Sequence, residues 1–207
     1  MSKTKKRILL AALKLFNQNG FVNVRLQHIA DECNMSVGNL AYHFYSKEAI
    51  ITSLINELGK KQSILLANYM AVPLFEHIDN ILEQNYKLQQ LYQFFYLDTL
   101  EVYRSFNKIK KISQTLIKQQ IIQIEGMFLF NASRGAFIKN KDYKLLANAF
   151  WMMGHLWMYE QHLLGHKTYT LEAYKTRLWL ILKPYFTLTG NAEYENLISN
   201  KRGGILK

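Results

Sequence analysis

Small and polar side chains gather in residues 36–47, and their types suit contact with a nucleic acid. Gly38 carries no side chain, so the backbone at this point can approach a partner closely. Asn39 offers both a donor and an acceptor to a base edge or a phosphate. Tyr42 and Lys47 carry a hydroxyl and an ammonium group that suit phosphate oxygens. This combination indicates a surface that reads a nucleic acid.

Short helices are expected to position these side chains. The apolar residues that recur at helical spacing are Leu26, Ile29, Ala30 and Cys33. They predict a helix of little more than two turns that places Cys33 in a core. After a tight turn, Ser36 is a suitable N-cap for a second helix, Val37–His43, which Leu40 and Phe44 would hold on its scaffold. Two short helices joined in this way let the second helix enter a DNA major groove.

The sequence here resembles the TetR family of bacterial transcriptional regulators. The resemblance is carried by Ile29-Ala30, Ser36-Val37-Gly38-Asn39-Leu40, Tyr42-His43-Phe44 and Ser46-Lys47-Glu48, preceded by Leu15-Phe16 and Gly20. It covers about residues 5–55, and the all-helical remainder agrees with the family in class and length. The resemblance implies DNA-contacting roles for Ser36, Gly38, Tyr42, His43 and Lys47, with Lys47 and the free N–H groups at its helix start receiving a phosphate.

Some positions depart from the family pattern. Val24-Arg25 stands where family members often have Thr or Ser, so a hydroxyl cap and its phosphate contact are missing. Arg25 can replace that contact by charge, with Asn23 as a cap. Ala41 stands where an aromatic residue is common, and Val37 either touches a thymine methyl group or packs internally. The predicted DNA-contacting set is Arg25, Ser36, Val37, Gly38, Asn39, Tyr42, His43 and Lys47.

Composition supports a folded helical protein with a polyanionic partner. The 207 residues are 49% apolar and include only 2 Pro and 10 Gly, so long helices are favoured over a turn-rich β fold. The formal net charge is +11, and such a charge suits DNA, an anionic membrane surface or an acidic ligand. The lone Cys33 excludes an internal disulfide. No secretory signal and no run of about 18 apolar residues is visible, which predicts a cytoplasmic protein with no membrane partner.

The expected fold is all-α: an N-terminal three-helix helix-turn-helix unit followed by a larger C-terminal helical bundle. We place the DNA-binding domain in residues 1–48 and the ligand-sensing and dimerisation domain in residues 49–207. A connecting helix, capped by Ser46, should run from Ser46 to Tyr69. The later helices are expected at Leu74–Gln90, Tyr92–Ser105, Lys108–Arg134, Tyr143–Leu164 and Leu171–Thr187. The polar tail from Asn191 is expected to be frayed or weakly helical.

The larger domain is expected to pair with a second copy and to hold an effector. Its last two long helices are rich in rings, and the predicted homodimer interface is Trp151, Leu156, Leu163, Leu178, Trp179 and Leu182. The predicted ligand-binding set is Tyr92, Tyr96, Tyr103, Phe128, His155 and Tyr159. These residues would line a pocket for a small hydrophobic or aromatic effector, although core packing explains such a stripe equally well. His155, His162 and His166 are interpreted as interface or pocket residues rather than metal ligands.

Two basic stretches leave alternatives open. The N-terminal arm contains Lys3, Lys5, Lys6 and Arg7, and it either contacts the DNA backbone or is solvated. A second stretch contains Arg104, Lys108, Lys110, Lys111 and Lys118. If the chain has the TetR topology, the turn at residues 105–107 should point toward the DNA-binding unit, but a solvated face is the simpler interpretation.

The function predicted from the sequence is a ligand-responsive repressor that binds a palindromic operator as a homodimer. An effector in the larger domain would favour one setting of the connecting helix and so change the separation of the two recognition helices. The sequence lacks H-E-x-x-H, G-x-S-x-G, E-x-x-H and Gly-rich phosphate-loop motifs, so neither an enzyme nor a cofactor is expected. The alternative is a basic helical protein that binds nucleic acid or membranes nonspecifically.

Overall fold

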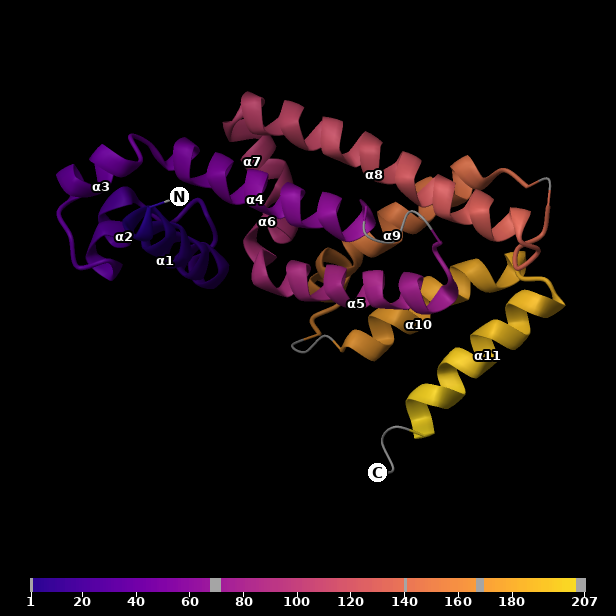
Figure 1. The fold of residues 1–207 in the computed structure, drawn as a ribbon. Coiled ribbons are helices and arrows are strands. Elements are labelled where there is room, and N and C mark those ends of the chain that lie inside the picture. Colours follow the sequence, from indigo (N-terminus) through magenta and orange to yellow (C-terminus); the bar gives the residue numbers. More distant parts are fainter. Residues whose placement is uncertain (1, 68–71, 140, 167–169, 204–207) are drawn as a thin grey trace. The chain divides into compact units, whose positions relative to one another are not determined.

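The computed structural model describes residues 2–67, 72–139, 141–166 and 170–203, and within these ranges the regular elements are helices (Figure 1). In chain order they are α1 (Lys3–Asn19), α2 (Leu26–Glu32), α3 (Val37–His43), α4 (Lys47–Ala67), α5 (Phe75–Leu91), α6 (Gln93–Leu97), α7 (Thr99–Ser105), α8 (Asn107–Ser133), α9 (Tyr143–Leu163), α10 (Leu171–Leu182), the 3₁₀ turn η1 (Lys183–Tyr185) and α11 (Leu188–Gly203). The predicted all-α class is confirmed. The predicted end of the connecting helix at Tyr69 lies outside the described residues. None of the described helices is long and apolar enough to span a membrane.

The chain packs into two compact units. The first comprises residues 1–61 and 88–116, and the second comprises residues 62–87 and 117–207. Internal packing therefore groups most of α4, and the segment from the end of α5 to the middle of α8, with the helix-turn-helix. The boundary between functional domains at residues 48 and 49 stays a prediction.

The first unit is built around α1. The Ser2 hydroxyl accepts a hydrogen bond from the Lys5 N–H and caps the helix, whose buried stripe is Ile8, Leu9, Ala12, Leu13 and Phe16. Phe16 packs on Phe94 of α6, with ring centroids 5.2 Å apart. Asn17 adds two hydrogen bonds, because its side-chain amide donates to the Leu91 carbonyl and accepts from the Phe94 N–H. These contacts fix the helix-turn-helix scaffold to α6.

The predicted single helix Tyr92–Ser105 is wrong, because the chain breaks into α6 and α7 at Asp98. Asp98 has φ −102° and ψ 16°, outside the helical range. Its side-chain carboxylate accepts a hydrogen bond from the Phe21 N–H near the start of the loop after α1. Beyond α7, the Phe106 ring lies 6.1 Å from the Phe21 ring. The prediction that the turn at residues 105–107 points toward the DNA-binding helices is therefore confirmed.

The second unit has an aromatic core. Phe75 of α5 lies against Phe137, Trp179 and Phe186, with ring centroids 4.9–5.7 Å apart. Trp179 also donates its indole N–H to the buried Asp79 carboxylate at 3.1 Å. The predicted helix Leu171–Thr187 ends early, at Leu182, and the chain continues into η1 through Pro184, which lacks the N–H that a continuing helix needs.

The tail from Asn191 was expected to be frayed or weakly helical, and its described residues are helical and belong to α11. Gly190 allows this helix to approach the chain closely, since a Cβ atom there would lie 2.1 Å from the Ala136 carbonyl oxygen. Glu193 pairs with Arg134 at 2.7 Å and accepts the Phe75 N–H at 3.0 Å. Tyr194 packs on Trp179, with centroids 5.3 Å apart. Tertiary contacts thus order a segment whose polar composition suggests a free end.

Candidate nucleic-acid interface and internal cavity

The turn between α2 and α3 has a well-defined backbone conformation. Asn34 has φ 51°, in the left-handed region that Asn tolerates better than most residues. The Met35 N–H donates to the Ala30 carbonyl at 3.0 Å and the Asn34 N–H to the Asp31 carbonyl at 2.9 Å. This pair of bonds is the Schellman end of a helix. Cys33 is buried beneath the turn, as predicted, and burial raises the pKa of its thiol.

Helix α3 is anchored on one side and exposed on the other. The Ser36 hydroxyl accepts the Asn39 N–H at 3.1 Å, which confirms the predicted cap. Leu40 is fully buried, whereas Asn39 is exposed and Tyr42 keeps 85% of its surface accessible. A Cβ atom on Gly38 would meet only the Ser36 hydroxyl, at 3.9 Å, so internal packing does not require glycine there. The exposed backbone at Gly38 is therefore left for an external partner.

Arg25 marks the start of α2. It occupies the N-cap position, its side chain makes no capping hydrogen bond, and the residue is exposed. The His28 ring nitrogen Nδ1 accepts the Arg25 N–H at 3.3 Å. The expectation that Asn23 caps this helix is wrong, because its side-chain amide donates to the Asn19 carbonyl instead. The Arg25 guanidinium group thus stays available for a phosphate.

The side chain of Lys47, at the start of α4, packs against the loop after α1 and does not extend into solvent. Its Nζ is 4.9 Å from the centre of the Phe21 ring and 3.4 Å from the Val22 carbonyl oxygen. Burial lowers the pKa of the Lys47 ammonium group. The Ser46 hydroxyl accepts the Ala49 N–H, so Ser46 caps α4 as predicted. Lys47 therefore stabilises the loop after α1 in this structure, and its phosphate contact stays a prediction.

Other side chains extend the exposed polar surface of the first unit. The arm residues Lys3, Lys5, Lys6 and Arg7 are exposed, and Lys5 lies over the Phe44 ring at 5.7 Å. Tyr45, directly after α3, is 83% exposed. Tyr45 is not among the predicted DNA contacts, although an aromatic residue with a hydroxyl group beside the recognition helix is a usable signal. Ser36 is also exposed, while Val37 and His43 are partly buried.

The chain matches two family models over most of its length. Residues 8–54 match the model described as "Bacterial regulatory proteins, tetR family", and residues 63–194 match "Bacterial transcriptional repressor". The second match alone exceeds half of the chain. The chain belongs to the TetR family. It is therefore a helix-turn-helix transcriptional regulator that binds DNA and not an enzyme.

Individual relatives and solved structures are similar to this chain. The transcriptional regulator UidR of Escherichia coli strain K12 is 44% identical over 52 residues, which cover 25% of this chain and 26% of UidR. The match thus spans about a quarter of that curated relative. A TetR-family regulator from Marinobacter aquaeolei VT8 has a similar solved structure, with TM-score 0.77 and 26% identity over 90% of this chain and 93% of that chain. The fatty acid degradation regulator FadR from Bacillus halodurans shares the fold, with TM-score 0.72 and 17% identity over 88% and 96% of the two chains.

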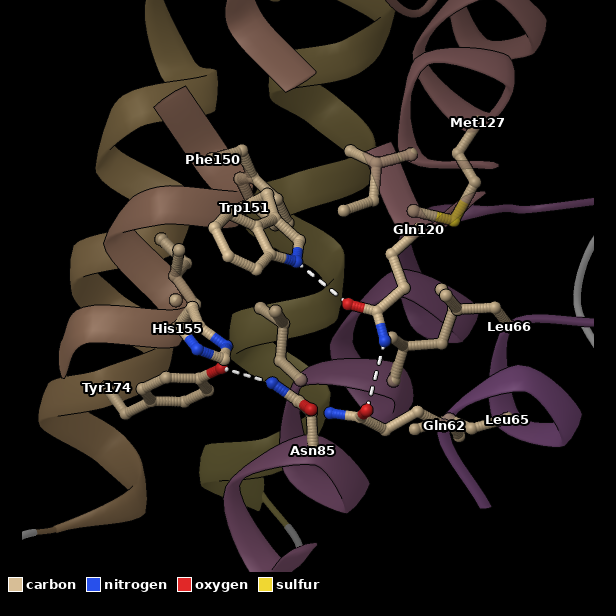
Figure 2. Close-up of a pocket in the computed structure, with 15 residues that line it drawn as sticks. Gln62, Leu65, Leu66, Asn85, Gln120, Met127, Phe150, Trp151, His155 and Tyr174 are labelled. Atoms are coloured by element: carbon tan, nitrogen blue, oxygen red, sulfur yellow. Dashed lines mark hydrogen bonds between the residues drawn. The ribbon is translucent and has the colours of Figure 1, made fainter. Parts of the chain in front are cut away.

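The second unit of this TetR-family chain contains a cavity of about 60 Å³ (Figure 2). Its apolar lining residues are Leu65, Leu66, Ile81, Leu82, Ile124, Met127, Phe150, Gly154 and Leu178. Its polar lining residues are Gln62, Asn85, Gln120, Trp151, His155 and Tyr174. They come from α4, α5, α8, α9 and α10, so tertiary packing alone brings them together.

Hydrogen bonds join the polar lining residues to one another. The Trp151 indole N–H donates to the Gln120 side-chain oxygen at 2.8 Å, and the Gln120 amide donates to the Gln62 side-chain oxygen at 3.0 Å. Figure 2 shows this series of hydrogen bonds crossing the cavity from α9 to α4. Asn85 donates to the Tyr174 hydroxyl at 2.9 Å. His155 stacks on Trp151 at 4.4 Å, and burial lowers the pKa of His155 from 6.5 to about 4.

The structure does not bring the predicted ligand set together at this cavity. His155 lines it, whereas Phe128 is buried among the rings of the core and Tyr159 is exposed. Tyr92, Tyr96 and Tyr103 belong to the first unit. The amide residues that do line the cavity escaped the sequence analysis, because Gln and Asn within a helix usually indicate a solvated face. Among the described residues, no group of three His, Cys, Asp or Glu side chains is placed to hold a metal ion.

The residues of the predicted homodimer interface differ in how exposed they are within a single chain. Leu178, Trp179 and Leu182 are at most 1% exposed within a single chain, so they have no surface for a second copy, and this part of the expectation is corrected. Trp151 lines the cavity instead. Leu156 and Leu163 are exposed, at 46% and 68%. Together with Leu145, Met152 and Tyr159 they form an exposed apolar stripe along α9, which we call the α9 stripe.

Proposed function

We propose that this regulator is a ligand-responsive repressor that binds a palindromic operator as a homodimer. The observation that supports DNA reading most directly is the division of α3, with Leu40 buried and Gly38, Asn39 and Tyr42 exposed. Asn39 would read a base edge, while Tyr42, Ser36 and His43 would contact phosphates. Arg25 would add a charge contact on the same surface. Val37 would touch a thymine methyl group, and Lys47 would serve this surface from the start of α4.

The homodimer is supported by the α9 stripe. Its members Leu145, Met152, Leu156 and Leu163 follow helical spacing and are 46–69% exposed. On the neighbouring α10, Leu180 is 57% exposed. Exposed apolar residues gathered on adjacent helices mark an interaction surface. We assign it to a second copy of this chain because a seven-residue recognition helix needs a twin on a two-fold operator.

The response to an effector is assigned to the cavity in the second unit. Its lining includes Gln62, Leu65 and Leu66 from the end of α4, the helix whose first residue is Lys47. An effector that binds one setting of α4 more tightly would shift the population toward that setting. A change in DNA affinity of about a hundredfold needs about 3 kcal/mol of coupling, which is within the usual range for allosteric proteins.

Repression in the cytoplasm is proposed as the biological action. The description "Bacterial transcriptional repressor" of the model matching residues 63–194 favours repression over activation. The high positive charge suits an intracellular polyanion. The effector would be a small hydrophobic molecule, and no cofactor or metal ion is included in the proposal.

The deciding experiment measures DNA affinity and its sequence dependence. Fluorescence anisotropy at physiological salt would compare a palindrome from the promoter region of the protein's own gene with a scrambled duplex of equal length. We expect the palindrome to bind at least a hundredfold more tightly, with two chains per duplex. Equal affinity for both duplexes would contradict the proposal and support nonspecific binding by a basic protein.

A further inference from the structure

We propose that the cavity of the second unit binds a compact uncharged ligand with an apolar body and one hydroxyl group. This inference rests on the proposed function only for the consequence of binding, and the binding itself can be measured without DNA. It narrows the effector class, because the chain's large positive charge would by itself favour an anion.

The lining of the cavity gives a charged ligand nothing to pair with. Among the described residues that line it there is no Lys, Arg, Asp or Glu. The lining histidine, His155, is neutral at pH 7 because burial holds its pKa near 4. A carboxylate or an ammonium group would therefore lose its hydration without gaining a counter-ion, which is costly in an apolar site.

Charged side chains of α5 and α10 near the cavity form ion pairs with one another. Lys175, next to the lining residue Tyr174, pairs with Asp79 at 2.9 Å and with Glu83 at 3.0 Å. Asp79 also accepts the Trp179 indole N–H. Glu83 also pairs with Lys87 at 2.8 Å, so in this group two ammonium charges balance two carboxylate charges.

The polar part of the lining favours a group that both accepts and donates. Gln120 accepts from Trp151 and donates to Gln62, so its amide is the centre of a chain that links α9, α8 and α4 (Figure 2). A hydroxyl group can accept from the Gln120 amide and donate to the Gln62 side-chain oxygen, so it would leave neither group unsatisfied. The Leu, Ile, Met and Phe side chains of the remaining wall suit an apolar body.

The volume limits the ligand to a few heavy atoms unless the wall moves. An engineered cavity of about 150 Å³ in another protein holds one benzene molecule, whereas this cavity measures about 60 Å³. Met127 is the lining residue with the most adaptable side chain, and its rotation would enlarge the space. A short-chain alcohol is therefore a suitable probe.

The test uses nuclear magnetic resonance of the ¹⁵N-labelled full-length protein. The Trp151 indole N–H signal, assigned with Trp151→Phe, is followed during titration with 1-butanol, butyrate and n-butylammonium at pH 7.5 and equal ionic strength. We expect a saturable shift with 1-butanol and at least tenfold weaker binding of both ions. Equal or tighter binding of either ion, or no saturable shift with the alcohol, would overturn the proposal.

Two variants separate the cavity from the rest of the surface. Gln120→Leu should weaken 1-butanol binding at least fivefold, whereas Gln119→Leu, an exposed neighbour on α8, should leave it unchanged. If Gln120→Leu fails to fold, as judged by circular dichroism, Gln62→Leu tests the same series of hydrogen bonds. If the folded variant binds 1-butanol as tightly as the wild type does, these side-chain amides do not bind the hydroxyl group and the proposal is refuted. If 1-butanol binds but leaves operator affinity unchanged, the ligand response is refuted but the selectivity of the cavity is not. If the protein binds the palindrome and the scrambled duplex equally well, only the proposed function is refuted.

Discussion

The carboxylate of Asp98 accepts a hydrogen bond from the backbone N–H of Phe21, with 3.1 Å between Oδ2 and the nitrogen. Gly20, with φ 71°, turns the chain at the end of α1 so that this N–H points away from the helix. The Phe21 ring then contacts Phe106 and lies under the Lys47 ammonium group. The loop before α2 is thus stabilised by contacts with the residue between α6 and α7, with the first residue of α4 and with the residue before α8.

Removal of the Asp98 carboxylate should destabilise the first unit. In Asp98→Ala the partly buried Phe21 N–H loses its acceptor, which we expect to cost about 1–2 kcal/mol in the free energy of unfolding. Asp98→Asn keeps a side-chain oxygen in the same place and should cost less. Urea denaturation followed by circular dichroism measures both values. An Asn variant as unstable as the Ala variant would show that charge, and not the hydrogen bond, is responsible.

Tyr42→Phe should weaken DNA binding without affecting folding. The side chain is 85% exposed, so the fold does not depend on its hydroxyl. Loss of one phosphate hydrogen bond should reduce affinity by about 1 kcal/mol, for the palindrome and the scrambled duplex alike, with an unchanged salt dependence. Tyr185→Phe, in η1 of the second unit and outside the α9 stripe, is the control. Anisotropy titrations at three salt concentrations would contradict the assigned contact if the two variants behaved identically.

Asn34 can be tested as a backbone position. Its φ of 51° costs most non-glycine residues about 1 kcal/mol or more. We expect Asn34→Ala to lower the free energy of unfolding by about that amount and Asn34→Gly to leave it within a few tenths of a kcal/mol of wild type. Denaturation curves of the three proteins provide the comparison. Equal stability of the Ala and Gly variants would mean that the turn relaxes to another conformation.

Local signals explain why the sequence predicts the backbone of the helix-turn-helix well. The Ser36 cap, the Asn34 turn and the spacing of Ile29, Ala30 and Cys33 all act within a few residues of one another. Their effect on the backbone depends little on the rest of the fold. The break at Asp98 escaped prediction because its cause is a contact with Phe21, 77 residues away.

Long-range packing explains why the sequence does not predict the cavity lining or the burial of the α10 rings. Gln62, Asn85 and Gln120 lie on three different helices, and nothing in their local sequence distinguishes them from solvated amides. The rings of α10 suggested a dimer surface because their covering partners come from distant segments. Phe75 and Tyr194, for example, bury Trp179 within a single chain. Such pairings depend on topology, and helical periodicity alone does not contain them.

His155 should make stability depend on pH. Burial lowers its pKa from 6.5 to about 4 in the folded protein, so between these values the unfolded state binds more protons at this residue. Stability should therefore fall as the pH drops through this window, by about 1 kcal/mol from pH 7.5 to 5.5. His155→Gln should lack this part of the pH dependence, and His162→Gln, exposed on the same helix, should keep it. Urea denaturation at the two pH values distinguishes them, and identical slopes for wild type and His155→Gln would contradict the assignment.

Disruption of the α9 stripe should separate the two copies while leaving each folded. Leu156→Lys and Leu163→Lys place charges on side chains that are 46% and 68% exposed in one chain, so the cost falls on the paired state rather than on the monomer. We expect sedimentation velocity to show a monomer and operator affinity to fall at least tenfold, because a single recognition helix then binds each half-site alone. Leu100→Lys, a 67% exposed leucine on α7, should leave both properties unchanged. If the stripe variants stayed dimeric with native unfolding curves, the pairing surface would have to lie elsewhere on the chain.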